Sequence, residues 1–83
     1  MTKPFDADHI TPHNWEGAFG ARKKPVLVWA VQLNFPEGFI VSTINGTARG
    51  APGDYLVINS MGDRHVVGRV VFERAYERVE EKP

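Results

Sequence analysis

The sequence predicts a mainly β fold: a small antiparallel β-barrel or β-roll of about five to six strands, with a short N-terminal arm or helix. Ten Val and four Ile outnumber three Leu among the 83 residues, and β-branched side chains suit a pleated sheet. Eight Gly and six Pro supply turns at short intervals. Closure into a barrel would protect the sheet edges of so small a chain.

Charge and cysteine content exclude several classes of protein. There are 10 Lys and Arg against 10 Asp and Glu, a formal net charge of zero, and 42% of the residues are hydrophobic, enough for a core. The absence of cysteine excludes disulfides, thiolate catalysis and cysteine-ligated zinc. The longest apolar stretch is too short to cross a bilayer and no signal peptide is recognisable. We therefore expect a cytoplasmic protein with no membrane partner.

Composition divides the chain into two parts. Residues 1–21 contain few β-branched side chains and are expected to form an N-terminal arm, whereas residues 22–83 are expected to form a small β-barrel domain. Within the arm, Thr11 suits a helix N-cap, and a proline follows it at the first helical position. A short helix over residues 12–19, ended by Gly20, is one interpretation, and a loose arm is the other.

Residues 26–33 form the clearest strand. Both faces are mostly apolar, as the alternating side chains show: Val26, Val28, Ala30 and Gln32 on one face, and Leu27, Trp29, Val31 and Leu33 on the other. A strand with two apolar faces is typical of the centre of a sheet. It is therefore predicted to be central and covered on both sides.

The remaining strands are expected at residues 39–44, 47–49, 55–59, 64–71 and 77–81. Asn45 and Gly46 predict a type I′ hairpin turn, because that turn needs positive φ at both central residues. A proline–glycine pair at residues 52–53 predicts another turn, and Gly68 predicts a bulge or bend. One helical turn is expected over residues 72–76.

Two blocks of the sequence resemble a family of short phage and prophage proteins. The first block is Arg22-Lys23-Lys24-Pro25-Val26, continued by Val28, Ala30 and Gln32. The second comprises Thr43, Gly46, Arg49-Gly50-Ala51, Pro52-Gly53-Asp54-Tyr55-Leu56-Val57, Gly62, Phe72, Tyr76 and Glu77. The two blocks lie within residues 22–80. The resemblance implies a phage or prophage origin and a compact β-rich fold.

The chain departs from that family in two respects. Members usually begin at the first block, so the 21 residues before it are additional. Members also often carry a longer insert before the second block, whereas only ten residues separate Gln32 from Thr43 here. The resemblance implies no activity, because no activity common to the family is established.

A cluster in the arm has the side chains of a metal site, namely Asp6, Asp8, His9 and His13. The two histidines have the i, i+4 spacing of a helical metal-binding pair. Pro12 lies between them, however, and a proline disfavours helical geometry at the residue before it. A solvated or packed arm explains these residues without a metal, so we expect no metal site and no cofactor.

A second cluster, Ser60, Asp63 and His65, contains the side-chain types of a hydrolytic triad. All three fall within one predicted hairpin, where serine and aspartate are ordinary turn residues. Triad members normally come from separate elements that fix their geometry, and no nucleophile elbow is present. We therefore expect no catalytic residues and a protein that is not an enzyme.

A basic stretch leads into the first strong strand. Arg22, Lys23 and Lys24, together with Arg49, could attract a phosphate backbone, and Phe35 could stack on a base. The sequence pI near 6.8 argues against a nucleic-acid module, since such modules are usually clearly basic. A solubilising charge cluster before a strand is the alternative interpretation.

Three functional hypotheses follow. The first is a non-enzymatic phage or prophage accessory protein that binds a host protein in the bacterial cytoplasm, plausibly as a modulator or inhibitor of a defence protein, with a homodimer as a further option. The second is a small-ligand or nucleotide binder, and the third is a nucleic-acid-binding module. The candidate ligand- or partner-binding residues are Arg22, Lys23, Lys24, Trp29, Phe35, Arg49, Asp54, Tyr55, Arg64 and Arg69. For Asp54, hydrogen bonding within its own turn is the simpler role.

Overall fold

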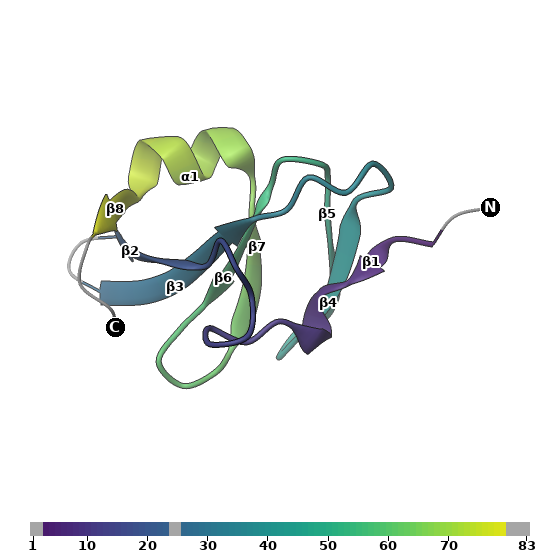
Figure 1. Cartoon of the computed structure of the whole chain (residues 1–83), viewed down its shortest axis with the longest axis horizontal. Coiled ribbons are helices and arrows are strands. Elements are labelled where there is room, and N and C mark those ends of the chain that lie inside the picture. The colour runs from purple at the N-terminus through teal and green to yellow at the C-terminus, as the bar shows by residue number, and fades with distance from the viewer. Residues whose placement is uncertain (1–2, 24–25, 80–83) are drawn as a thin grey trace.

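A five-stranded antiparallel sheet forms the centre of the computed structural model, which describes residues 3–23 and 26–79 (Figure 1). Its strands, in spatial order, are β7 (Arg64–Val67), β6 (Tyr55–Ile58), β3 (Val26–Gln32), β2 (Phe19–Lys23) and β8 (Glu77–Val79). A three-stranded sheet contains β1 (Phe5–Asp6), β4 (Phe39–Thr43) and β5 (Gly46–Gly50), and β1 runs parallel to β4. The helices are η1 (Ala7–His9), a 3₁₀ turn, and α1 (Arg69–Ala75).

The mainly β fold class is confirmed, but the details of the architecture differ from the expectation. The described residues form eight strands, where about five to six were expected, because the N-terminal segment supplies β1 and β2. These strands form two separate sheets that do not close into a barrel. The parallel pairing of β1 with β4 is a further departure from an all-antiparallel fold.

The prediction that residues 26–33 form a central strand covered on both sides is confirmed. β3 lies in the middle of the five strands, between β2 and β6. On one face Val28 and Ala30 pack with Phe72 of α1. On the other face Val31 packs with Phe39 of the three-stranded sheet. Figure 1 shows α1 over β2 and β3, and the three-stranded sheet beyond β7.

The helix expected over residues 12–19 is wrong, and so is the alternative of a loose arm. Ala7 and Ile10 are fully buried in the core beside β4. Asn14 accepts a hydrogen bond from the Thr11 amide at 2.7 Å and donates one to the His9 carbonyl at 3.0 Å, which fixes a turn. This side chain competes with helical hydrogen bonding, as asparagine commonly does.

The expected boundary between an arm of residues 1–21 and a domain of residues 22–83 falls inside β2. Gly20 and Ala21 pair with Trp29 and Val28 of β3, and both are buried. Because these side chains are small, β2 fits beside bulky neighbours such as Tyr55 and Phe72. This segment therefore forms a strand although it contains few β-branched residues. Composition therefore misplaced the edge of the folded unit, which includes the N-terminal segment.

The predicted hairpin between β4 and β5 is present, but its turn lies one residue earlier than expected. Thr43 pairs with Gly46, so Ile44 and Asn45 are the two loop residues. Only Gly46 has positive φ, at 111°, whereas a type I′ turn at Asn45 and Gly46 would require it at both. The Thr43 hydroxyl accepts the Asn45 amide and donates to the Gly46 carbonyl, which stabilises the observed turn.

The strand expected over residues 64–71 is shorter than predicted, and the helix after it is longer than predicted. β7 ends at Val67, and Gly68, expected as a bulge or bend, is instead the N-cap of α1. Phe72 sits between the rings of Tyr55 and Tyr76, with centroids 3.8 and 4.6 Å away. This tertiary stacking overrides the β propensity of the preceding valines. The strand expected at residues 77–81 is confirmed as β8 to Val79, and its remainder lies outside the described residues.

Replacing Gly50 by alanine should destabilise the fold by about 1–3 kcal/mol or more. Gly50 is buried opposite Phe39, and an added Cβ would overlap the phenyl ring. Urea denaturation measures the change. The matched control is Gly68→Ala, whose Cβ would enter open space at φ −59° and should change stability by about 0.5 kcal/mol or less. Equal stability of the two variants would contradict this packing.

The N-terminal segment is tied to β4 by Asp8. Its two carboxylate oxygens accept hydrogen bonds from the Ser42 amide at 2.7 Å and the Ser42 hydroxyl at 2.8 Å. These bonds favour the ionised form and hold the pKa of Asp8 below its ordinary value, with a smaller contribution from the charge of Arg64. The exposed carboxylate therefore joins two segments 34 residues apart.

Asp8→Asn should lower the free energy of unfolding at pH 7 by about 1 kcal/mol, because a neutral amide replaces the ionised acceptor on the surface. The pKa of Asp8 is lower in the folded state, so its contribution is complete above the unfolded pKa of about 4 and is lost as pH falls through the folded pKa. Urea denaturation of both proteins should show the difference shrinking in acid. An unchanged difference between pH 7 and about pH 2 would contradict this role.

Candidate functional site

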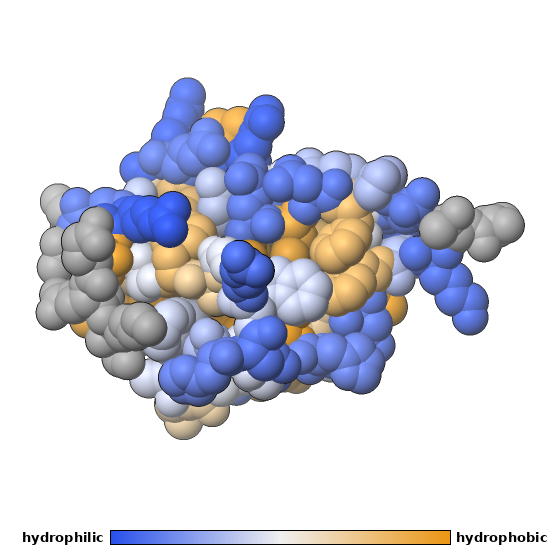
Figure 2. All heavy atoms as spheres, viewed as in Figure 1, coloured by the Kyte–Doolittle hydropathy of each residue, from blue (hydrophilic) through white to orange (hydrophobic). Residues whose placement is uncertain are grey.

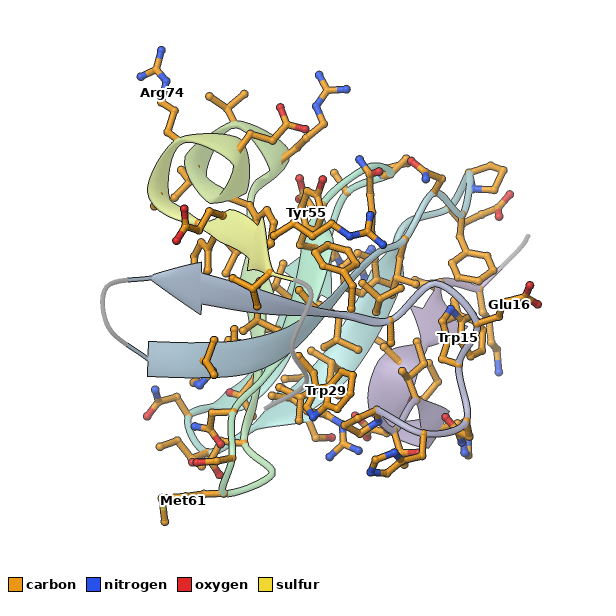
Figure 3. All side chains as sticks on the ribbon, turned by 60° about the vertical axis from the view of Figure 1, so that its left-hand side comes forward. Trp15, Glu16, Trp29, Tyr55, Met61 and Arg74 are labelled. Carbon is orange, nitrogen blue, oxygen red and sulfur yellow. The ribbon has the colours of Figure 1, made fainter. Side chains whose placement is uncertain are left out.

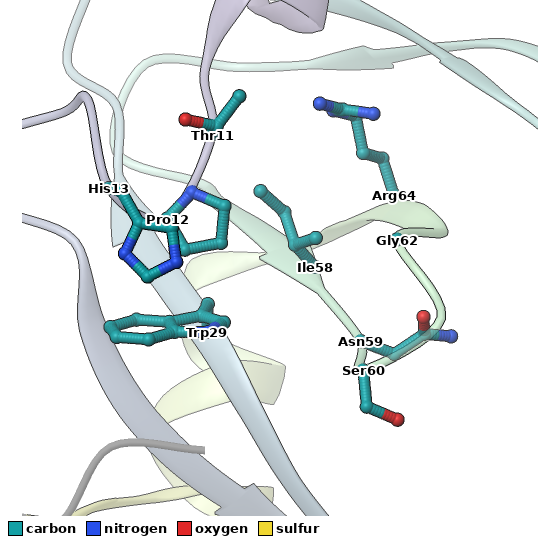
Figure 4. Close-up of a pocket in the computed structure, with 9 residues that line it drawn as sticks. All are labelled: Thr11, Pro12, His13, Trp29, Ile58, Asn59, Ser60, Gly62 and Arg64. Atoms are coloured by element: carbon teal, nitrogen blue, oxygen red, sulfur yellow. The ribbon is translucent and has the colours of Figure 1, made fainter.

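A pocket of about 350 Å³ opens between the N-terminal segment, β3 and the β6–β7 hairpin. Trp29 and His13 form one side, and their rings meet edge to face with centroids 5.7 Å apart. Ser60 lies across the pocket on the hairpin, and Thr11 and Arg64 lie at one end (Figure 4). The pocket thus brings Trp29 and Arg64, two of the candidate binding residues, to one place.

Sequence reasoning missed the rest of this pocket. His13 was considered only as a metal ligand, and Ser60 only as part of a triad. Thr11 was considered only as a helix cap. The one signal that pointed here was the joint presence of an aromatic and a cationic residue among the candidates, but nothing in the sequence placed them together.

Arg64 is held in position by the N-terminal segment. Its Nη2 donates to the Ile10 carbonyl at 3.0 Å, across 54 residues of sequence. The Nε atom is buried and has no hydrogen-bond partner among the described residues. The charge of Arg64 helps to lower the pKa of Asp8, but both carboxylate oxygens of Asp8 accept hydrogen bonds from Ser42. The guanidinium is therefore oriented and incompletely satisfied.

The β6–β7 hairpin is built around Asn59. Its side-chain oxygen accepts hydrogen bonds from the amides of Met61 and Asp63, both at 2.9 Å. The exposed Ser60 side chain at the turn has no hydrogen-bond partner among the described residues. His65 follows Arg64 on β7, so the alternation of a strand directs the two side chains to opposite faces of the sheet. Of the triad-like side chains Ser60, Asp63 and His65, only Ser60 therefore lines the pocket.

In the cluster that has the side chains of a metal site, the carboxylates of Asp6 and Asp8 form hydrogen bonds that stabilise the fold. Asp6 caps η1 by accepting the Asp8 amide at 3.0 Å, and Asp8 binds Ser42. His13 lies against Trp29 instead of joining these acids. Across the described ranges 3–23 and 26–79, no three metal-ligating side chains come together.

Asp54 connects the turn at residues 51–54 with the first residue of α1. Its carboxylate accepts the Ala51 amide at 3.0 Å and the Arg69 amide, the first of the helix, also at 3.0 Å. Gln32 donates to the Gly53 carbonyl at 3.0 Å, which ties β3 to the same turn. Gly53 has φ of 92°, a conformation that favours glycine. Hydrogen bonding within the fold thus explains the role of Asp54 in this turn.

Tyr55 lies between the sheet and α1, on the side away from Trp29 (Figure 3). Its ring stacks on Phe72, and only 8% of the residue is exposed. Burial raises the pKa of the Tyr55 hydroxyl above its ordinary value, and the nearby carboxylate of Glu73 adds to the shift. This tyrosine packs the core, so a ligand could reach it only at its edge.

The remaining candidate residues whose side chains are described, Phe35, Arg49 and Arg69, do not lie together at one site. Phe35 stacks on Phe5 with centroids 4.2 Å apart, beside the core, so it is no free base-stacking platform. Arg49 is exposed on β5, and Arg69 is exposed at the start of α1. The side chains of Arg22, Lys23 and Lys24 lie outside the described residues, so the nucleic-acid contact stays a prediction.

The outer face of α1 carries an apolar surface. Val70 and Val71 are 57% and 58% exposed, because only Phe72 of this helix is buried against the sheet. Arg69 and Arg74 flank them, and neither guanidinium has a carboxylate partner within the described part of the chain. Figure 2 shows apolar surface at the top of the molecule between hydrophilic side chains, and Arg74 points away from the sheet in Figure 3.

Comparisons of the chain with protein-family models, with curated proteins and with solved structures find no match. Within residues 3–23 and 26–79, the structure has no helix with the length and apolar character needed to cross a bilayer. The pocket and the outer face of α1 are the two candidate binding surfaces of the described structure.

Asp54→Ala should destabilise the protein by about 2 kcal/mol, because it removes the acceptor for two backbone amides at once. Asp54→Asn should lie between wild type and alanine, since the amide keeps one oxygen. Thermal and urea unfolding measure both. Glu37→Ala, an exposed acidic turn residue, is the control and should change stability little. If Asp54→Ala changed the stability as little as Glu37→Ala does, the hydrogen bonds of Asp54 would not stabilise the fold.

Proposed function

We propose that this protein is a non-enzymatic phage or prophage accessory protein that binds a host protein through the outer face of α1. A modulator or inhibitor of a host defence protein is one form of this function. The observation that carries the proposal is the exposed pair Val70 and Val71 between two arginines, Arg69 and Arg74, that have no carboxylate partner among the described residues. The phage origin rests on the sequence resemblance.

The geometry of α1 suits contact with another protein. Phe72 is the one buried side chain of this seven-residue helix, and the other side chains of the helix are exposed to solvent. Adjacent exposed valines gain free energy when a partner covers them, by roughly 25 cal/mol for each Å² of apolar surface removed from water. Arg69 and Arg74 would then attract carboxylates around that contact. The partner is therefore a protein with an apolar patch bordered by acidic residues.

The arrangement of polar side chains supports binding over catalysis. Asp8 and Asp54 are each committed to hydrogen bonds that hold segments of the fold together. Of the triad-like side chains, Ser60 lines the pocket on the hairpin loop, whereas Asp63 and His65 do not line it. A general base or nucleophile needs a free side chain near an activating partner, which these residues do not provide.

The test is retention of host proteins by the tagged full chain and by the double variant Val70→Asp/Val71→Asp. Wild type should retain a defined protein near stoichiometry, and the double variant at least tenfold less, as expected when central interface residues are lost. Asp at these positions, in the first turn of α1, is compatible with the helix dipole, so the fold should persist. Circular dichroism and thermal unfolding verify this.

Ile44→Asp is the matched control, because Ile44 is 75% exposed in the β4–β5 loop, away from α1. It should retain the partner as wild type does. Equal retention by the control and the double variant, or no retained protein, would contradict the proposal. Light scattering distinguishes a homodimer: a dimer that the double variant converts to monomer would assign this face to self-association instead.

A further inference from the structure

We propose that the pocket between the N-terminal segment and the β6–β7 hairpin binds a small aromatic anion, a flat ring that carries a phosphate or carboxylate group. The pocket lies on the face of the five-stranded sheet opposite α1, since Trp29 packs with the core cluster of Val31 and Phe72 packs with that of Val28. The site is thus separate from the proposed protein contact and does not depend on it.

The walls of the pocket suit a flat ring. The rings of Trp29 and His13 form one wall, and Ile58 contributes an apolar side chain to the lining. Trp29 is half-buried, and Ile58 is 5% exposed, so both are fixed by the sheet that carries them. A volume of about 350 Å³ is at the lower end of the usual range for ligand sites and fits one small molecule.

The polar groups of the pocket suit an anion. Arg64 is the charged residue of the lining, and no Asp or Glu joins it among the described residues that form the pocket. Its Nη2 is anchored on the Ile10 carbonyl, whereas Nη1 has no protein partner within the described segments. An oriented guanidinium with free N–H groups binds phosphate or carboxylate strongly and with geometric specificity.

Neutral donors surround this cation. The hydroxyls of Thr11 and Ser60 and the indole N–H of Trp29 have no hydrogen-bond partner in the described structure. Each can donate to an acceptor oxygen or nitrogen of a ligand, which adds specificity to the charge of Arg64. A ring beside Trp29 with an anionic group at Arg64 would use both ends of the pocket in Figure 4.

The test is a titration of the ¹⁵N-labelled full chain with adenosine 5′-monophosphate, followed by NMR of the side-chain N–H groups. The Trp29 indole and Arg64 Nε–H resonances should shift and saturate below about 1 mM ligand. The indole of Trp15, which packs against Phe5 with centroids 5.4 Å apart, is the internal reference and should not move. Adenosine alone and inorganic phosphate alone should each bind at least tenfold more weakly.

A second titration with indole-3-acetate tests whether the anionic group of the ligand is a carboxylate or a phosphate. Binding of the nucleotide alone assigns a phosphate ligand, binding of indole-3-acetate alone assigns an aromatic carboxylate, and binding of both assigns the shared ring-plus-anion chemistry. If neither shifts the Trp29 and Arg64 resonances, or if inorganic phosphate saturates them as readily as the nucleotide, the proposal is overturned.

Variants locate the site. Arg64→Lys keeps the charge but loses the planar fork, and should weaken binding at least tenfold. His13→Ala and Ser60→Ala remove exposed side chains and should weaken it without unfolding the protein, which keeps the test valid if Arg64→Lys is unstable. Arg78→Lys, on β8 at the opposite edge of the sheet from β7, is the matched control and should bind as wild type. Unchanged binding by His13→Ala and Ser60→Ala together would overturn the site.

Discussion

The structure depends on β3, a strand whose two faces are both apolar. Val28 and Ala30 on one face and Val31 on the other are at most 7% exposed, so water must be excluded from both sides. A chain of 83 residues has too few elements to do this with two full layers. It covers one face with a single short helix and the other with a small sheet and an irregular N-terminal segment.

Each cover is attached by a few specific contacts. Phe72 fastens α1 by stacking on Tyr55, and Asp54 holds the first amide of the helix. Ile10 fastens the N-terminal segment, which Asp8 ties to the three-stranded sheet through Ser42. Because the anchors are few, much of each covering element is left at the surface, where it can take part in binding.

The sequence correctly predicts those elements whose conformation is determined by their own residues. Residues 26–33 were identified as a covered central strand because their side chains alternate between two apolar faces. The helix over residues 12–19 was wrong because the Asn14 side chain forms a turn that cap residues alone do not reveal. The valines before Phe72 favour a strand, yet stacking of that ring places them in α1. The pocket could not be predicted, because it joins His13, Trp29 and Arg64 only through tertiary packing.

Both proposed binding surfaces result from the small number of elements that cover the sheet. On the α1 side, Phe72 is the one buried side chain of the helix, so the face opposite it is exposed and carries Val70 and Val71. On the other side, a segment without regular hydrogen bonding cannot follow the sheet closely, so a pocket remains beside the β6–β7 hairpin with Arg64 at its end. The five hydrogen-bonded strands lie between the two surfaces, so a ligand at one surface makes no contact with the other.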